Sequence, residues 1–134
     1  MIDPVAAGLP HRPPFVFIEE IVELQPGRHA KCTKFFAASE PFFAGHFPGN
    51  PLVPGVILTE AMAQAAGVAA GQPGRAFRLS AIKLMKFLKP VLPGSSVTFT
   101  AEKAAEIGGL WQFHTKASVG DEVVAEGVIV LAAA

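Results

Sequence analysis

The stretch "GHFPGNPLVPGVILTEAMAQ", Gly45–Gln64, decides the fold because it joins a rigid loop to the one convincing long helix of the chain. Proline suits the first helical turn, and Ala, Leu, Met, Glu and Gln favour a helix interior. We therefore expect a helix from Pro54 to about Ala70, ended by the Gly and Pro residues at 71–74. Because this segment is apolar nearly all round, the helix should be buried on most sides.

The segments on either side of this helix are strand-like. Before it, Phe15–Leu24 and the run 29–37 predict a hairpin across "QPGRH". After it come the runs 76–88, 96–106, 110–119 and 122–133, the last three separated by the hairpin signals "IGG" and "GD". The run 81–88 also fits a helix, since period alone does not decide so short a segment. One buried helix with five or six antiparallel strands predicts an α+β fold whose sheet curls around the helix.

Length and composition favour one globular domain over residues 1–134. The chain is 51% apolar and 16% charged, and its formal net charge is zero, so no global field favours nucleic acid or an anionic membrane. The single cysteine, Cys32, excludes an internal disulfide and a CxxC metal site. Without a signal peptide or a membrane-length apolar run, we expect a cytoplasmic protein. The high apolar fraction also predicts a subunit interface.

A carboxylate and a histidine in the opening stretch are candidates for chemistry. Glu60 lies among apolar helix residues, and an apolar site favours the protonated acid, which can donate a proton. The alternative is a structural carboxylate bonded to a backbone N–H or an arginine. His46 lies in a loop that Gly and Pro hold rigid, where a general base could sit, unless it only fills the loop.

The start of the helix is a third candidate. The N–H groups of Gly55, Val56 and Ile57 lie at the positive end of the helix dipole, where they could hold a carbonyl oxygen that gains charge. Gly55 has no side chain, so a substrate could approach closely. The alternative is an ordinary helix end in water.

The remaining candidates are weaker. The other histidines lack metal-ligand spacing, and we interpret them as structural or surface groups: His11, His29 and His114. A basic cluster could dock an acidic partner or be solvated surface; it comprises Lys83, Lys86, Lys89, Arg75 and Arg78.

Four motifs, in order and spacing, resemble the FabZ-type (3R)-hydroxyacyl-[acyl-carrier-protein] dehydratases over nearly the whole chain. They are "LPHRPPF", "GHFPGNPLVPGVILTEAMAQ", "KFLKPVLPGS" and "VVAEG". In that family the histidine of GHFPG and the glutamate of EAMAQ are catalytic, which implies His46 and Glu60 here. The chain departs from the family at Pro13, where an aromatic residue is common, and at Ser95, where an acidic residue is usual.

The resemblance implies a hot-dog fold and a reaction that converts a (3R)-3-hydroxyacyl thioester to the trans-2-enoyl thioester. It implies a homodimer, which in the family often assembles into a hexamer as a trimer of dimers, with His46 and Glu60 of each site from different protomers. The Gly55 N–H would bind the thioester carbonyl, and an acidic acyl carrier protein would dock near Lys86 and Lys89. No metal or organic cofactor is implied. In relatives the peptide after the catalytic histidine can be cis, so we predict a cis bond before Phe47.

Two other functions share this scaffold. A hot-dog acyl thioesterase would activate water at the carbonyl and release a free thiol. A non-catalytic acyl-binding protein could keep the fold without the chemistry, although intact His46 and Glu60 argue against it.

Overall fold

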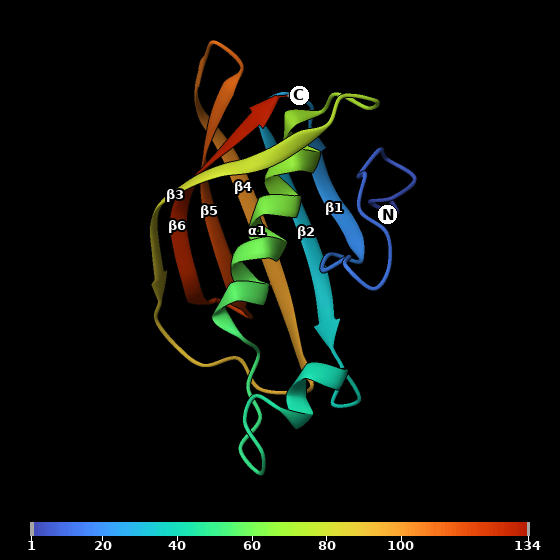
Figure 1. Ribbon diagram of the computed structural model, residues 1–134, viewed down its shortest axis with the longest axis vertical. Coiled ribbons are helices and arrows are strands. Elements are labelled where there is room, and N and C mark those ends of the chain that lie inside the picture. The colour runs from blue at the N-terminus through green and yellow to red at the C-terminus, as the bar shows by residue number, and fades with distance from the viewer. Residues whose placement is uncertain (1, 134) are drawn as a thin grey trace.

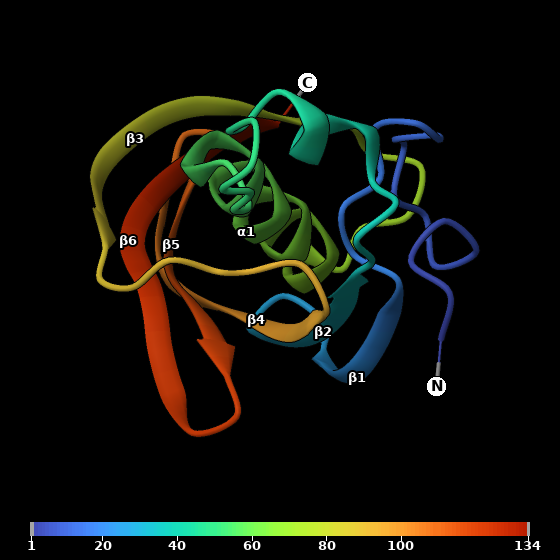
Figure 2. The same cartoon turned by 90° about the horizontal axis from the view of Figure 1, so that it is seen from below.

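The computed structural model describes residues 2–133, which form a six-stranded antiparallel sheet curled around one α-helix (Figure 1, Figure 2). The strand order is β1-β2-β4-β5-β6-β3, so β1 and β3 are the two edges. This arrangement confirms the predicted α+β hot-dog fold. In chain order the elements are β1 (Glu20–Gln25), β2 (His29–Phe36), the 3-10 helix η1 (Pro41–Ala44), α1 (Gly55–Ala70), β3 (Phe77–Phe87), β4 (Ser95–Ile107), β5 (Leu110–Val119) and β6 (Glu122–Ala133).

The first predicted strand is shorter than the sequence pattern suggested. The expected range was Phe15–Leu24, but pairing with β2 begins at Glu20. The preceding residues are drawn toward the helix instead, because the backbone N–H of Phe17 donates to the side-chain oxygen of Gln64 at 2.9 Å. An apolar, extended run therefore does not become a strand when a buried side chain takes its backbone hydrogen bonds.

Helix α1 begins one residue later than predicted. Pro54 has φ −58° and ψ 136°, an extended conformation, so it caps the helix and Gly55 is the first helical residue. At the other end Gly71 takes the left-handed conformation, with φ 64°. A Cβ at Gly71 would also lie 2.7 Å from the Cα of Pro26, so only glycine fits there.

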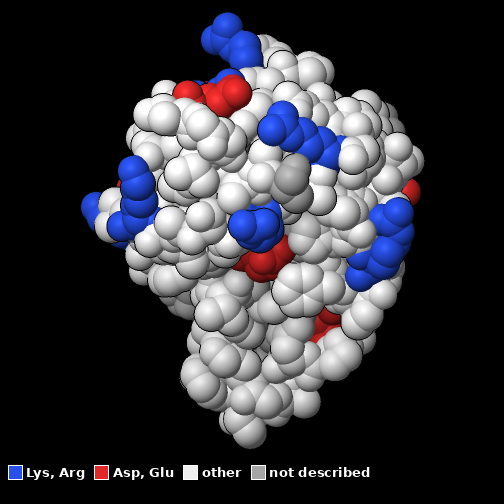
Figure 3. All heavy atoms as spheres, turned by 45° about the horizontal axis from the view of Figure 1, so that its top comes forward, with Lys and Arg blue, Asp and Glu red and all other residues white. Residues whose placement is uncertain are grey.

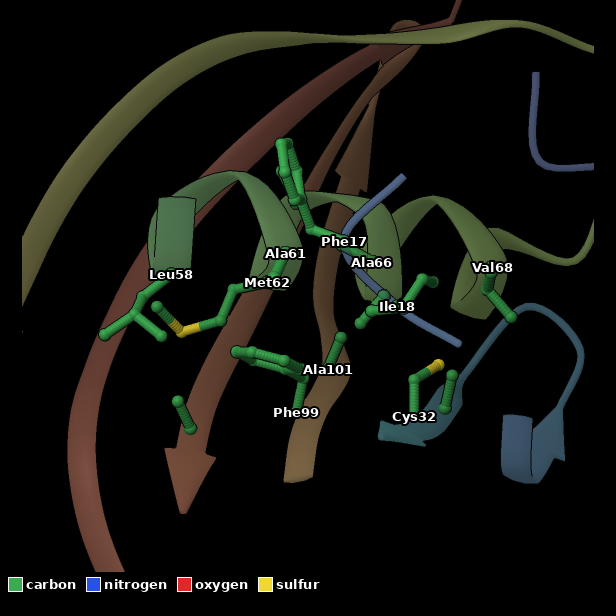
Figure 4. Packing of buried hydrophobic residues seen from close by; sticks show 14 of the residues in the cluster. Phe17, Ile18, Cys32, Leu58, Ala61, Met62, Ala66, Val68, Phe99 and Ala101 are labelled. Carbon is green, nitrogen blue, oxygen red and sulfur yellow. The ribbon is translucent and has the colours of Figure 1, made fainter. Parts of the chain in front are cut away.

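The core lies between α1 and the concave face of the sheet. From Leu58 to Ala70 every helix residue is buried except Glu60 and Gly67, which confirms the prediction of a helix buried on most sides. The helix packs chiefly on β4 and β2, and Figure 4 shows Leu58 and Met62 beside Phe99 of β4. Cys32 of β2 is fully buried in this core, and burial raises the pKa of its thiol to about 12.

The edge strand β3 carries an apolar surface. The run 81–88, which also fitted a helix, lies in this strand except for Leu88, because residues from Phe77 to Phe87 pair with β6. Its large apolar side chains Leu79, Ile82, Leu84 and Phe87 are each about 40–50% exposed. No helix within residues 2–133 is long and apolar enough to cross a membrane.

Candidate active site

Glu60 lines a cavity of about 290 Å³ that runs along one face of α1. The helix residues that line the cavity recur at helical spacing; they include Glu60, Gln64, Gly67 and Val68. The opposite walls come from the N-terminal segment, from residues 71–79 around the start of β3, and from Leu131 of β6. The side chain of Glu60 is 21% exposed, so it is a largely buried carboxyl group at the wall of a cavity.

Gln64 fixes the position of Glu60. Its side chain is 1% exposed, and both the oxygen and the nitrogen of its amide make hydrogen bonds. Its oxygen accepts from the Phe17 N–H, and its nitrogen donates to the Phe15 carbonyl at 3.0 Å and to Oε2 of Glu60 at 3.0 Å. Because a backbone N–H can only donate and a carbonyl can only accept, these contacts determine which way the amide points.

His11 lies beside the same carboxyl oxygen. Its Nε2 is 3.4 Å from Oε2 of Glu60, and its ring stacks on Phe15 with centroids 6.2 Å apart. The sequence interpretation of His11 as a structural or surface group therefore missed a neighbour of Glu60. The position of Gln64 was the sequence signal that could have found this neighbour. Gln64 lies four residues after Glu60, on the same helix face, and its side chain binds the backbone of Phe15, close in sequence to His11.

The loop around His46 holds the imidazole in one tautomer. Nδ1 of His46 is 3.0 Å from the carbonyl oxygen of Leu52, and the Leu52 N–H donates back to the His46 carbonyl at 2.9 Å. A carbonyl only accepts, so Nδ1 carries the hydrogen and Nε2 of the neutral ring has a free lone pair. The ring also stacks on Phe47, and the peptide between His46 and Phe47 is cis, as predicted.

No side-chain hydrogen bond or ion pair joins His46 to Glu60 within residues 2–133. The cavity wall that includes Glu60 does not include His46. Among residues 2–133, the His46 ring bonds to the Leu52 carbonyl and stacks on Phe47, whereas the Glu60 carboxyl group accepts from Gln64 and lies beside His11.

The helix start differs from the expectation in two ways. Ile57 is not free, because its N–H donates to the Pro54 carbonyl at 2.9 Å; within residues 2–133 the N–H groups of Gly55 and Val56 remain without an acceptor. The space beside Gly55 is also occupied, since a Cβ there would lie 3.0 Å from the ring of Phe87. Because Gly55 has no side chain, the ring of Phe87 can pack against the start of the helix.

Three lysines of the predicted basic cluster lie at one edge of the sheet. Lys83 and Lys86 lie on the edge strand β3, and Lys89 follows it. Nζ of Lys83 donates to Gln112 at 2.6 Å, and Lys89 pairs with Glu122 at 2.5 Å. On the face drawn in Figure 3 the basic side chains are spaced apart rather than gathered in one patch.

Known proteins resemble this chain over most of its length. The family model of the FabA-like domain matches residues 9–128. The 3-hydroxyacyl-[acyl-carrier-protein] dehydratase FabZ of Ruminiclostridium cellulolyticum is 42% identical over 125 residues, which cover 90% of this chain and 88% of that protein. The enzyme of the same name from Thiobacillus denitrificans is 39% identical over 133 residues, or 93% of this chain and 91% of that protein.

Solved structures share the fold at low identity. A chain of the dehydratase heterocomplex ApeI:P from Xenorhabdus doucetiae has a TM-score of 0.82 at 19% identity, covering 98% of this chain and 91% of that one. A sigma28-regulated virulence protein from Campylobacter jejuni has a TM-score of 0.71 at 14% identity, with coverages of 96% and 85%. From its sequence relatives and the domain match, the chain belongs to the FabA-like family, and within it to the 3-hydroxyacyl-[acyl-carrier-protein] dehydratases of the FabZ type.

Proposed function

We propose that this protein is an enzyme that removes water from 3-hydroxyacyl-[acyl-carrier-protein] in fatty acid or related acyl-chain biosynthesis. The observation that carries this conclusion is its similarity to enzymes of that name over about nine tenths of the chain. The finer assignment, from the (3R)-hydroxy substrate to the trans-2-enoyl product, rests on the sequence motifs around His46 and Glu60.

His46 is the general base in this proposal, and Glu60 is the acid. Nε2 of His46 takes a proton from C2, the electrons form the C2–C3 double bond, and the C3 hydroxyl leaves as water with a proton from Glu60. The tautomer of His46 supports this role, because Nδ1 is bound to Leu52 and Nε2 has the lone pair. The position of Glu60 on the cavity wall, with its carboxyl group held by Gln64, supports its role as the group that meets the leaving hydroxyl.

The start of α1 would bind the thioester. The Gly55 N–H lies at the positive end of the helix and has no acceptor within residues 2–133, so in this proposal it donates to a carbonyl oxygen that gains negative charge when C2 loses its proton. The acyl chain would extend into the cavity beside Glu60, whose wall includes Leu24, Phe77 and Leu131.

A homodimer would complete each site. The unpaired edge of β3 exposes Leu79, Ile82 and Leu84, and an exposed apolar edge strand is a surface that proteins usually cover. Pairing of two β3 edges would join the two sheets, and His46 of one protomer would then meet Glu60 of the other. Within residues 2–133 no side-chain hydrogen bond or ion pair joins the two groups, which is consistent with this arrangement. Three such dimers could form a hexamer.

An acyl carrier protein would present the substrate. We place its docking surface near Lys86 and Lys89, at and beyond the end of β3. Lys86 is exposed and makes no ion pair among the described residues, whereas Lys89 already pairs with Glu122, so Lys86 is the stronger candidate.

The test uses a 3-hydroxyacyl thioester and two substituted proteins. Wild-type protein should form the enoyl product without releasing a free thiol, and His46→Ala and Glu60→Ala should each be folded and nearly inactive. Thiol release in place of enoyl formation would identify a thioesterase and overturn the proposal.

Mixing the two inactive proteins tests the shared site. After co-refolding, about half of the dimers are mixed, and each mixed dimer has one intact site, so activity should return to roughly a quarter of wild type. Mixing without subunit exchange should restore none. Verified mixed dimers that remain inactive would show that the pair is not shared between protomers.

A further inference from the structure

The environment of His11 indicates where its proton lies. Nδ1 of His11 is buried and has no hydrogen-bond partner among the described residues, whereas Nε2 is 3.4 Å from Oε2 of Glu60. A hydrogen on Nδ1 would be a buried donor without an acceptor, which is costly. In the neutral ring the hydrogen therefore lies on Nε2, where it faces the carboxyl oxygen.

Two donors then surround one oxygen of Glu60. Oε2 accepts from Gln64 Nε2 at 3.0 Å and faces the N–H of His11, while Oε1 has no hydrogen-bond partner within residues 2–133. An oxygen that faces two N–H donors has no room for a hydrogen of its own. When Glu60 is protonated, its hydrogen consequently lies on Oε1.

Other charged groups near the cavity do not replace this contact. Arg75 and Arg78 also line the cavity, but the guanidinium of Arg75 donates to Gln72 at 2.7 Å. Within residues 2–133, His11 is the only basic side chain within 4 Å of the Glu60 carboxyl group.

We propose that His11 is a positioning residue, whose neutral Nε2–H holds Oε2 of Glu60 together with Gln64 and directs the acidic hydrogen on Oε1 toward the substrate hydroxyl. This inference rests on the proposed dehydration, in which Glu60 supplies that proton. His11 itself exchanges no proton with the substrate. Its effect should therefore appear in kcat and leave KM nearly unchanged.

The test compares two substitutions of similar size. His11→Gln keeps an N–H donor near the position of Nε2, whereas His11→Met has a similar length and no donor. On a 3-hydroxyacyl thioester, kcat of His11→Met should fall about 10-fold or more, because a displaced catalytic group loses rate steeply. His11→Gln should stay within about 3-fold of wild type, since its side-chain amide keeps an N–H donor for Oε2 of Glu60.

Three results would overturn the proposal: equal kcat in all proteins, equal losses in His11→Met and folded His11→Gln, or a loss confined to KM. If His11→Met does not fold, His11→Leu, which also lacks a donor, takes its place. The proposed function is tested separately, since wild-type activity and its loss in Glu60→Ala do not depend on His11.

A thermal measurement supplies a readout independent of activity. The melting temperatures of wild type, His11→Met, Glu60→Gln and the double variant form a double-mutant cycle at equal protomer concentration. If His11 acts on Glu60, the two shifts should not add. Additive shifts would show that the two side chains are uncoupled and would overturn the inference.

Discussion

Replacing Gln64 by leucine should destabilise the protein through the backbone of residues 15–17. Gln64 is 1% exposed, and leucine has a similar size but no polar atoms. The main loss falls on the Phe17 N–H, because Phe17 is 7% exposed and water reaches it poorly. An unsatisfied buried donor costs about 1–3 kcal/mol, and the two weaker losses, at the exposed Phe15 carbonyl and at Glu60, add about 1 kcal/mol.

The sum is about 2–4 kcal/mol, and it converts to a measurable melting shift. At about 2.1 cal/mol/K per residue, 134 residues give an unfolding entropy of about 0.28 kcal/mol/K, so the melting temperature should fall by about 7–14 °C. Differential scanning calorimetry at a fixed protomer concentration measures this shift. The matched control is Gln72→Leu, in an exposed position, which should change stability by less than about 0.5 kcal/mol.

The same substitution should also lower the rate of dehydration, because Glu60 loses its donor at 3.0 Å. A Gln64→Leu protein that melts within about 2 °C of wild type would refute the reasoning. It would mean that the Phe17 N–H finds another acceptor and that the segment is not pinned by this side chain.

Three further outcomes are expected. The dehydration rate should follow a bell-shaped pH profile, because the proposed reaction needs one group that accepts a proton, His46, and one that donates a proton, Glu60; a flat profile would contradict these roles. Replacing Lys86 and Lys89 with glutamate should slow turnover of carrier-linked substrate and spare a short thioester without the carrier, whereas equal losses would point away from docking. Cys32 should resist thiol reagents at pH 8 in the native state, and stability should fall between about pH 9 and 12, where the unfolded thiol ionises and the buried one, with a pKa of about 12, does not. Rapid native-state labelling would contradict this burial.

Local patterns in the sequence were sufficient for most of the secondary structure. The helix could be predicted to within one residue, since apolar composition, the proline before it and the glycine after it all act within a few residues of the chain. The four later strands could be predicted as well, although the run 81–88 needed its partner β6 to exclude a helix. The separate positions of His46 and Glu60 were also visible as polar residues in a rigid loop and an apolar helix.

Only the tertiary structure decided how the site is assembled. Gln64 reaches Phe15 and Phe17, which are 49 and 47 residues away in sequence, and this contact shortens the first strand and brings His11 beside Glu60. Likewise Phe87 fills the space next to Gly55, which looked open in the sequence. Such contacts depend on how tightly the sheet curls around α1, and that curvature arises from the packing of all six strands together rather than from any local run of residues.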